Sequence, residues 1–363
     1  MRISFVLPGM HAVNRGAEVA FESVAAEIGR TGFDDVTVFG SGPPLPGRPY
    51  KYRQLGIVRR ERFRRAPKLP VLRSDTAYEE ATFAASFISK YRPSETDIVL
   101  SCSYPFLNWT LSHLPIRGRR PPHVFVTQNG DWPAHSRTAE YRLFRCDGLV
   151  CTNPDYYDRN RLRWKCALVP NGVDREIMHP GSPTRAAFGL PDGVPVVLMV
   201  SALIESKRVL EGVRAVAQLT DAHLVVAGDG EMRAQAYALA ERLMPGRFRC
   251  ITVPSDHMGE LYRSVDVVLH TSCYESFGNV YVEALSTGVP VVAHDYSVTR
   301  WIFGENPGLV DARDDAAVVD ALSQALRYGK ERAMTLVPGA GERFAWAAVA
   351  KEYRSFLEEV ASG

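Results

Sequence analysis

Short runs of apolar residues alternate along the chain with longer segments in which apolar positions recur every three or four residues. The short runs are typical of strands buried on both faces, and the longer spacing is typical of amphipathic helices. The first strand is predicted over residues 2–7, a helix follows to about Arg30, and a second strand lies at 36–39. This βαβ order recurs through most of the sequence and predicts an α/β fold.

One stretch, residues 265–295, combines a buried strand, a polar loop and a helix that Gly288 and Pro290 end. Backbone N–H groups at the start of that helix, about Gly278 to Val280, have no partners within the helix and lie at the positive end of its dipole. Such helix starts bind anions, and phosphates especially. The stretch therefore predicts a phosphate site.

Two carboxylates lie on either side of this helix start, Glu275 in the loop before it and Glu283 in its second turn. Carboxylates accept hydrogen bonds from hydroxyls. A ligand with a diphosphate in its middle and a polyhydroxylated ring at each side fits this layout. Sugar nucleotides have that form.

The length of 363 residues suits two domains, and 46% apolar with 23% charged residues is typical of a globular protein. The formal charge of +2 implies no polyelectrolyte partner for the whole chain. Six cysteines without a C-x-x-C pair indicate buried thiols in a reducing compartment. The apolar residues 1–7 are too short for a signal peptide, and no apolar stretch approaches about 18 residues, so we expect a cytoplasmic protein.

The first strand is followed by a loop without the G-x-G-x-x-G pattern, which weighs against dinucleotide oxidoreduction. Gly16 opens the next helix, where a residue without a side chain lets a ligand approach the backbone. We expect the domain boundary near Met178, which divides the chain into residues 1–177, 178–345 and a terminal helix, 346–363.

Residues 41–75 interrupt the α/β order and are expected to form an irregular loop. Within them, residues 48–73 contain ten basic residues against the single acid Glu61, with apolar residues interleaved. Such a segment can dock on anionic lipid, which would place the protein at the inner face of the membrane, or on an acidic acceptor. Nucleic acid is a further partner, but no recognised binding motif supports it. A solvated arginine-rich excursion is the plainer alternative.

The sequence E-S-F-G-N-V-Y-V-E-A-L-S-T-G-V-P, residues 275–290, resembles the E-x7-E signature of retaining glycosyltransferases of family four. The resemblance implies the GT-B fold, two Rossmann-like domains that face each other across a cleft. The first would lie on the acceptor side and the second would bind the donor nucleotide. The segment from Phe344 onward is similar to the last helix of this family, which crosses back to the first domain.

The resemblance also implies roles for residues of the second domain. Glu275 would bind hydroxyls of the donor sugar, and Glu283 would bind the ribose. Lys207 matches the lysine that grips the donor diphosphate, whereas the arginine of the family pattern is replaced by Ala202. Either other groups compensate for the loss of a bidentate guanidinium, with Arg208, Arg15 and the helix start at Phe277, Gly278 and Asn279 as candidates, or the donor is bound weakly.

Two further sites follow from the resemblance. The backbone near Val253 and Pro254 would pair with the nucleobase. The strand end at Gln128 often carries a histidine in the family, and glutamine can hydrogen-bond a sugar but cannot take a proton. We expect Gln128, Asn129 and Asp131 in the cleft, although Asn-Gly turn chemistry explains that loop equally well.

The implied reaction is transfer of a glycosyl group from a nucleoside diphosphate sugar, as co-substrate, to a hydroxyl of a glycan, lipid-linked or small-molecule acceptor. We expect no divalent metal, because no Asp-x-Asp pair lies at a plausible strand end. A non-catalytic or epimerase-type nucleotide-sugar protein is the alternative. A phosphorylase would need a Schiff-base lysine and a longer chain, and an oxidoreductase would bind nicotinamide.

Overall fold

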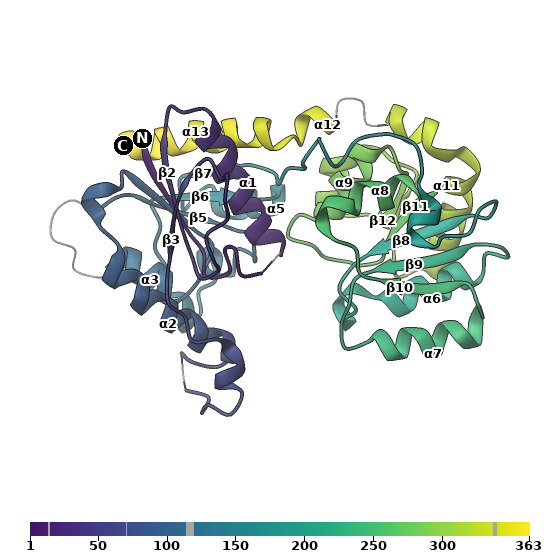
Figure 1. The fold of residues 1–363 in the computed structure, drawn as a ribbon, viewed down its shortest axis with the longest axis horizontal. Coiled ribbons are helices and arrows are strands. Elements are labelled where there is room, and N and C mark those ends of the chain that lie inside the picture. Colours follow the sequence, from purple (N-terminus) through teal and green to yellow (C-terminus); the bar gives the residue numbers. More distant parts are fainter. Residues whose placement is uncertain (14, 70, 114–119, 337–339) are drawn as a thin grey trace. The chain divides into compact units, whose positions relative to one another are not determined.

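The computed structural model describes the chain except residues 14, 70, 114–119 and 337–339. The chain forms two compact units, one comprising Met1–Asn171 with Trp346–Gly363 and the other Gly172–Ala345 (Figure 1). The division thus falls at the Asn-Gly turn, a few residues before the boundary expected at 177/178. No described helix has both the length and the apolar character needed to cross a bilayer.

The first unit is built on a seven-stranded parallel sheet in the order β3-β2-β1-β4-β5-β6-β7. Its strands are β1 (Arg2–Val6), β2 (Asp35–Gly40), β3 (Lys51–Gln54), β4 (Ile98–Ser101), β5 (His123–Val126), β6 (Gly148–Cys151) and β7 (Cys166–Leu168). Its helices are α1 (Gly16–Arg30), α2 (Asp75–Lys90), α3 (Phe106–His113), α4 (Trp132–His135), α5 (Pro154–Asn160) and α13 (Trp346–Ser362), with 3-10 turns at Arg60–Phe63, Pro93–Glu95 and Ala139–Tyr141.

Helix α13 completes the core of the first unit although it ends the chain. Its apolar face, which includes Tyr353, Phe356 and Leu357, is buried in one cluster with Phe5 of β1 and Phe21 of α1. Helix α13 packs against α1, whose upper end it meets in Figure 1. The expectation that the terminal helix returns to the first domain is confirmed.

Strand β3 corrects the expectation that residues 41–75 are wholly irregular. It pairs with β2 in parallel register, Val38 opposite Tyr52, at the edge of the sheet. Tyr52 donates a hydrogen bond to the Gly42 carbonyl at 2.9 Å, and its ring stacks on His11. The strand is short and half of its residues are charged, which is tolerated because an edge strand needs only one partner and one half-buried face. Because of its charged residues, this strand could not be predicted from the pattern of apolar positions.

The second unit contains a six-stranded parallel sheet in the order β10-β9-β8-β11-β12-β13. Its strands are β8 (Val196–Val200), β9 (His223–Ala227), β10 (Phe248–Ile251), β11 (Val267–His270), β12 (Val291–His294) and β13 (Leu309–Val310). Its helices are α6 (Val209–Ala217), α7 (Arg233–Leu243), α8 (Met258–Arg263), α9 (Asn279–Thr287), α10 (Ser297–Phe303), α11 (Asp315–Leu336) and α12 (Ala340–Arg343), with 3-10 turns at Arg185–Phe188, Glu205–Lys207 and Ser255–His257.

The apolar runs of the second unit are explained by helices on both faces of its sheet. In β8, Val196 and Leu198 are buried in one core cluster, while Val197 and Met199 are buried in another. Successive side chains of a strand point to opposite faces, so a strand covered on both faces has to be apolar at every position. The parallel sheets confirm the α/β fold class.

Candidate functional site

The strand order of the second unit marks where a ligand would bind. From β8 the chain builds outward to β9 and β10, then returns to place β11 on the other side of β8. In open parallel sheets, ligands bind beyond the carboxyl ends of the strands at such a switch point. The loop after β8 carries Lys207, and the loop after β11 carries Glu275.

Lys207 and Glu275 form a salt bridge across the switch point. Lys207 Nζ lies 2.5 Å from Glu275 Oε1, and His270 Nε2 lies 2.8 Å from the same oxygen. Burial opposes ionisation of Glu275, but the hydrogen bonds from His270 and Lys207 outweigh it and lower its pKa to about 2. The site therefore holds a permanent carboxylate beside a lysine.

The lysine loop is held in place by the strand beside it. The Thr271 hydroxyl donates to the carbonyls of Lys207, at 3.0 Å, and Arg208, at 2.8 Å. Arg208 itself has a left-handed backbone, with φ of 54° and ψ of 38°, which is uncommon for a residue with a side chain. Its tight turn ends the 3-10 segment at Lys207 and starts α6, so it directs the lysine toward the strand ends.

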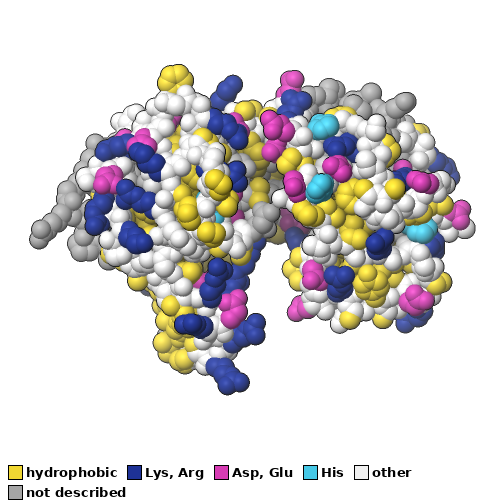
Figure 2. All heavy atoms as spheres, viewed as in Figure 1, with side chains coloured by type: hydrophobic (Ala, Val, Ile, Leu, Met, Phe, Trp, Pro, Cys, Tyr) yellow, Lys and Arg dark blue, Asp and Glu magenta, His cyan; other side chains and the backbone are white. Residues whose placement is uncertain are grey.

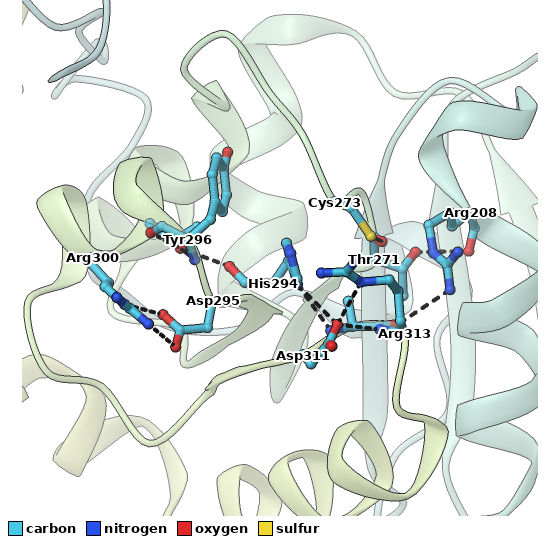
Figure 3. A network of polar contacts seen from close by, with 11 residues as sticks. Arg208, Thr271, Cys273, His294, Asp295, Tyr296, Arg300, Asp311 and Arg313 are labelled. Carbon is cyan, nitrogen blue, oxygen red and sulfur yellow. Dashed lines mark hydrogen bonds and ion pairs between the residues drawn. The ribbon is translucent and has the colours of Figure 1, made fainter. Parts of the chain in front are cut away.

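Figure 3 shows how the Arg208 side chain is tied to the neighbouring strand ends. Arg208 Nη2 donates to the Ala312 carbonyl at 3.3 Å, while its buried Nε has no partner among the described residues. The Ala312 N–H in turn donates to His294 Nδ1 at 3.1 Å, and His294 lies 3.5 Å from Asp311. The guanidinium is thus fixed at the site with hydrogen-bonding capacity left over.

The start of α9 has the geometry of an anion site. Gly278 has φ of 83°, and no side chain caps the helix. A Cβ at Gly278 would lie 2.3 Å from the Tyr281 ring, so only glycine fits here. The Phe277 ring is buried against Phe344 and Trp301, which leaves only its backbone for a ligand. Asn279 is the first residue of the helix.

Glu283 lies one turn further along α9 and is bound on one side only. Tyr262 donates its hydroxyl to Glu283 Oε2 at 2.6 Å, and no bond from a described residue reaches Oε1. Burial raises the pKa of this carboxyl. Val253 and Pro254, the other predicted residues of this unit, follow β10, with Val253 packed on the core and Pro254 exposed.

In the first unit, the predicted residues come from the loop after β5 and from the start of α1. Gln128 and Asn171 form a reciprocal amide pair, with N–O distances of 2.7 and 3.1 Å, so both amides already have protein partners. Gly16 starts α1, and the exposed Arg15 precedes it without capping the helix. Asn129 makes a long contact of 4.0 Å with Cys102 Sγ.

Asp131 is buried in a polar cluster of the first unit. Its carboxylate accepts a hydrogen bond from Asn160 at 2.7 Å and lies 3.0 Å from Arg159 Nε and 3.3 Å from His135 Nδ1. Trp132, the next residue, is 43% exposed. This cluster holds the loop after β5 in place and presents an indole beside it.

Sequence reasoning missed His270, Thr271 and Tyr262. Tyr262 and Thr271 bind residues that lie far from them in the chain. His270 lies at the end of an apolar strand, where a polar residue is easily assigned to the following loop. The one local signal is a histidine at the end of an otherwise apolar strand, five residues before Glu275. No group of three or more His, Cys, Asp or Glu side chains in the described part of the chain is placed to hold a metal ion.

The chain resembles known proteins in sequence. Residues 182–336 match the family model described as Glycosyl transferases group 1. The lipopolysaccharide core biosynthesis glycosyltransferase LpsE of Rhizobium meliloti is 31% identical over 207 residues, which cover 55% of this chain and 58% of LpsE. A D-inositol 3-phosphate glycosyltransferase of Corynebacterium jeikeium is 31% identical over 258 residues, 63% of this chain and 61% of that protein. The chain thus spans about three-fifths of the length of these relatives.

Solved structures match over nearly the whole chain. Sucrose-phosphate synthase from Thermosynechococcus elongatus superposes with a TM-score of 0.79 at 19% identity, covering 99% of both chains. Anabaena HepE in complex with UDP-glucose gives 0.73 at 18% identity, covering 99% of this chain and 100% of HepE. The protein therefore has the two-domain GT-B fold. Residues 182–336, all in the second unit, are the part of the chain that matches the group 1 glycosyltransferase model.

Proposed function

We propose that the protein is a retaining glycosyltransferase that moves a sugar from a nucleoside diphosphate sugar to an acceptor hydroxyl. The observation that carries the proposal is the Lys207–Glu275 pair at the switch point of the second unit, with the uncapped start of α9 beside it. It supplies a fixed positive charge for a diphosphate and a fixed carboxylate for sugar hydroxyls.

The donor lies in the second unit in this proposal. Lys207, Arg208 and the backbone N–H groups at the start of α9, Gly278 and Asn279, bind the diphosphate. Glu275 accepts hydrogen bonds from the transferred sugar. Glu283 Oε1, the oxygen that Tyr262 leaves open, accepts them from the ribose. The backbone at Phe277, Val253 and Pro254 completes the nucleotide site.

The bond between the anomeric carbon and the diphosphate oxygen breaks as the acceptor oxygen bonds to that carbon on the same face. The acceptor proton passes to the departing phosphate oxygen, so no side chain has to remove it. Negative charge grows on the leaving phosphate, where Lys207 and the helix start stabilise it. A divalent metal is not required in this scheme.

The acceptor is assigned to the first unit, at the strand ends near Gly16, Gln128 and Asp131, with Arg15 available to an anionic group. The names of two relatives refer to lipopolysaccharide core biosynthesis and to D-inositol 3-phosphate. We infer a polyhydroxylated acceptor of this kind. HepE was solved with UDP-glucose, which makes a uridine diphosphate hexose the first donor to test.

The test is replacement of Glu275 by alanine. Removing a group that contacts the transferred sugar at the reacting centre should lower release of nucleoside diphosphate from the donor by about 100-fold or more. Glu241→Ala, an exposed glutamate on α7, is the matched control and should retain full activity. Thermal shifts with uridine, guanosine and adenosine diphosphates and their sugars identify the donor beforehand.

The same assay separates the competing functions. Turnover at the unaltered rate in Glu275→Ala with every donor that binds would contradict the proposal. Conversion of the donor to another sugar nucleotide without acceptor would indicate an epimerase. Binding of the donor without any turnover would indicate a non-catalytic protein. Chelation by EDTA should leave transfer unchanged.

A further inference from the structure

The basic segment of the first unit, residues 48–73, separates into two groups of cations. Five of its ten bases are engaged in ion pairs with acids elsewhere in the unit. The pairs are Arg48–Glu22, Lys51–Asp35, Arg53–Glu95, Arg60–Glu79 and Arg73–Glu140. These cations are neutralised and serve the fold.

The side chains of the other five basic residues have no ionic or hydrogen-bonding partner among the described residues, and all five residues are exposed. They are Arg59, Arg62, Arg64, Arg65 and Lys68. The single acid among them is the exposed Glu61. The large apolar residues Leu69 and Val71, 47% and 43% exposed, follow directly. We call these seven cationic and apolar residues the basic apolar surface.

This surface lies on an ordered support. The Phe63 ring stacks on Tyr78 of α2 at 5.0 Å, and the Tyr78 hydroxyl donates to the Pro67 carbonyl at 2.6 Å. The Arg60 N–H donates to Glu79 at 2.7 Å, and the Val58 N–H to Thr82 at 3.0 Å. Helix α2 therefore holds the segment in place, while the five cations of the segment remain exposed to solvent.

Figure 1 shows the segment extending from the first unit beyond the start of α2, away from that unit's sheet. Figure 2 shows Lys and Arg side chains gathered on this extension with hydrophobic side chains beside them. These exposed cationic and apolar side chains do not contribute to the folding of the first unit. Its composition suits a flat anionic partner.

We propose that the basic apolar surface docks the protein on an anionic lipid bilayer. Arg59, Arg62, Arg64, Arg65 and Lys68 contact lipid phosphates, and Leu69 and Val71 enter the boundary between headgroups and acyl chains. Each cation near an anionic bilayer contributes about fivefold in partitioning at low salt. Exposed apolar side chains gain from entering the bilayer and gain little against a phosphate backbone, which favours lipid over nucleic acid.

The experiment is co-sedimentation of the full-length protein with vesicles of phosphatidylglycerol and phosphatidylcholine, compared with vesicles of phosphatidylcholine alone. We expect binding to the anionic vesicles only, weakening as salt rises from 50 to 500 mM because the charges are screened. The variant R62E/R64E/R65E should bind at least about 100-fold more weakly. The variant L69S/V71S should bind about tenfold more weakly with an unchanged salt dependence.

The control R214E/R242E/R327E makes the same change in net charge on exposed arginines of the second unit and should bind like the wild type. Circular dichroism and the thermal shift with nucleoside diphosphates show that each variant is folded, independently of whether the protein transfers sugars. Absence of anionic-vesicle binding, an equal loss in the control, or salt-dependent binding to duplex DNA without vesicle binding would each overturn the proposal.

Discussion

Two buried glutamates of this protein have pKa values shifted in opposite directions, because burial raises the pKa of both and only one of them has cationic partners that outweigh it. Glu275 is buried beside Lys207 and His270, whose hydrogen bonds lower its pKa to about 2. Glu80 is buried in the first unit, where it accepts hydrogen bonds from the backbone at the start of α3, and burial raises its pKa to about 7. The same side chain is therefore a permanent anion in one unit and close to half-protonated at neutral pH in the other.

Glu80 makes the stability of the first unit depend on pH. An acid with a raised folded pKa keeps its proton in the folded state after the unfolded chain has lost it. The free energy of unfolding therefore falls by about 3 kcal/mol as pH rises from about 4.5 to about 7. In Glu80→Gln this fall should be absent. The free energy of unfolding of the variant, relative to that of the wild type, should therefore be higher at pH 8 than at pH 5.

Urea unfolding at the two pH values measures this difference. Glu241→Gln on the exposed face of α7 is the control and should follow the wild type. A difference between Glu80→Gln and the wild type that is equal at pH 5 and pH 8 would show that Glu80 is not the titrating group.

Among the elements, the start of α9 depends most on a single position. Ala at Gly278 would meet both an unfavourable positive φ and the Tyr281 ring at 2.3 Å. Gly193→Ala offers a matched control, because Gly193 has φ of 74° and nothing within 4 Å of its Cβ. We expect Gly193→Ala to cost about 1 kcal/mol from the backbone alone. Gly278→Ala should cost about 2 kcal/mol more, since the helix start has to shift.

Thermal unfolding with and without nucleoside diphosphate separates stability from binding. Gly278→Ala should lose most of the nucleotide-induced shift, whereas Gly193→Ala should keep it. Equal losses of stability in the two variants would show that the Tyr281 ring gives way at no cost.

At the scale of the whole molecule, the end of the chain stabilises the unit that contains its beginning. Leu357 of α13 is fully buried in the core of the first unit. Leu357→Ala should destabilise that unit by about 2 to 5 kcal/mol. It should leave the nucleotide-induced shift of the second unit unchanged.

The control is Leu243→Ala, which removes the same atoms from a leucine of α7 that is 40% exposed and should cost under about 1 kcal/mol. Hydrogen exchange resolves the two units and shows which one opens more often. Increased exchange in the second unit instead of the first would contradict the assignment of α13 to the first unit's core.

Local pattern sufficed for much of the fold and for part of the site. The apolar runs at 196–200 and 265–269 predict buried strands because a strand covered on both faces has no polar position. Glu275 and Glu283 were predicted as site residues from their positions on either side of the helix start, whereas Lys207 was predicted only from the family resemblance. The same reasoning could not find β3, whose signal was obscured by its charges.

The sequence by itself determined the two α/β units and the helix start after Phe277, since each depends on residues close together in the chain. The return of the last helix was expected only from the family resemblance, because its partners in β1 and α1 lie at the other end of the chain. Only the tertiary structure decided which side chains meet. It joins His270 and Lys207 to Glu275, engages Gln128 with Asn171, and pairs half of the bases in 48–73 with distant acids while leaving the rest exposed. The physical reason is that a hydrogen bond or ion pair acts over a few ångströms, and only the fold decides which residues, however far apart in the chain, come within that distance.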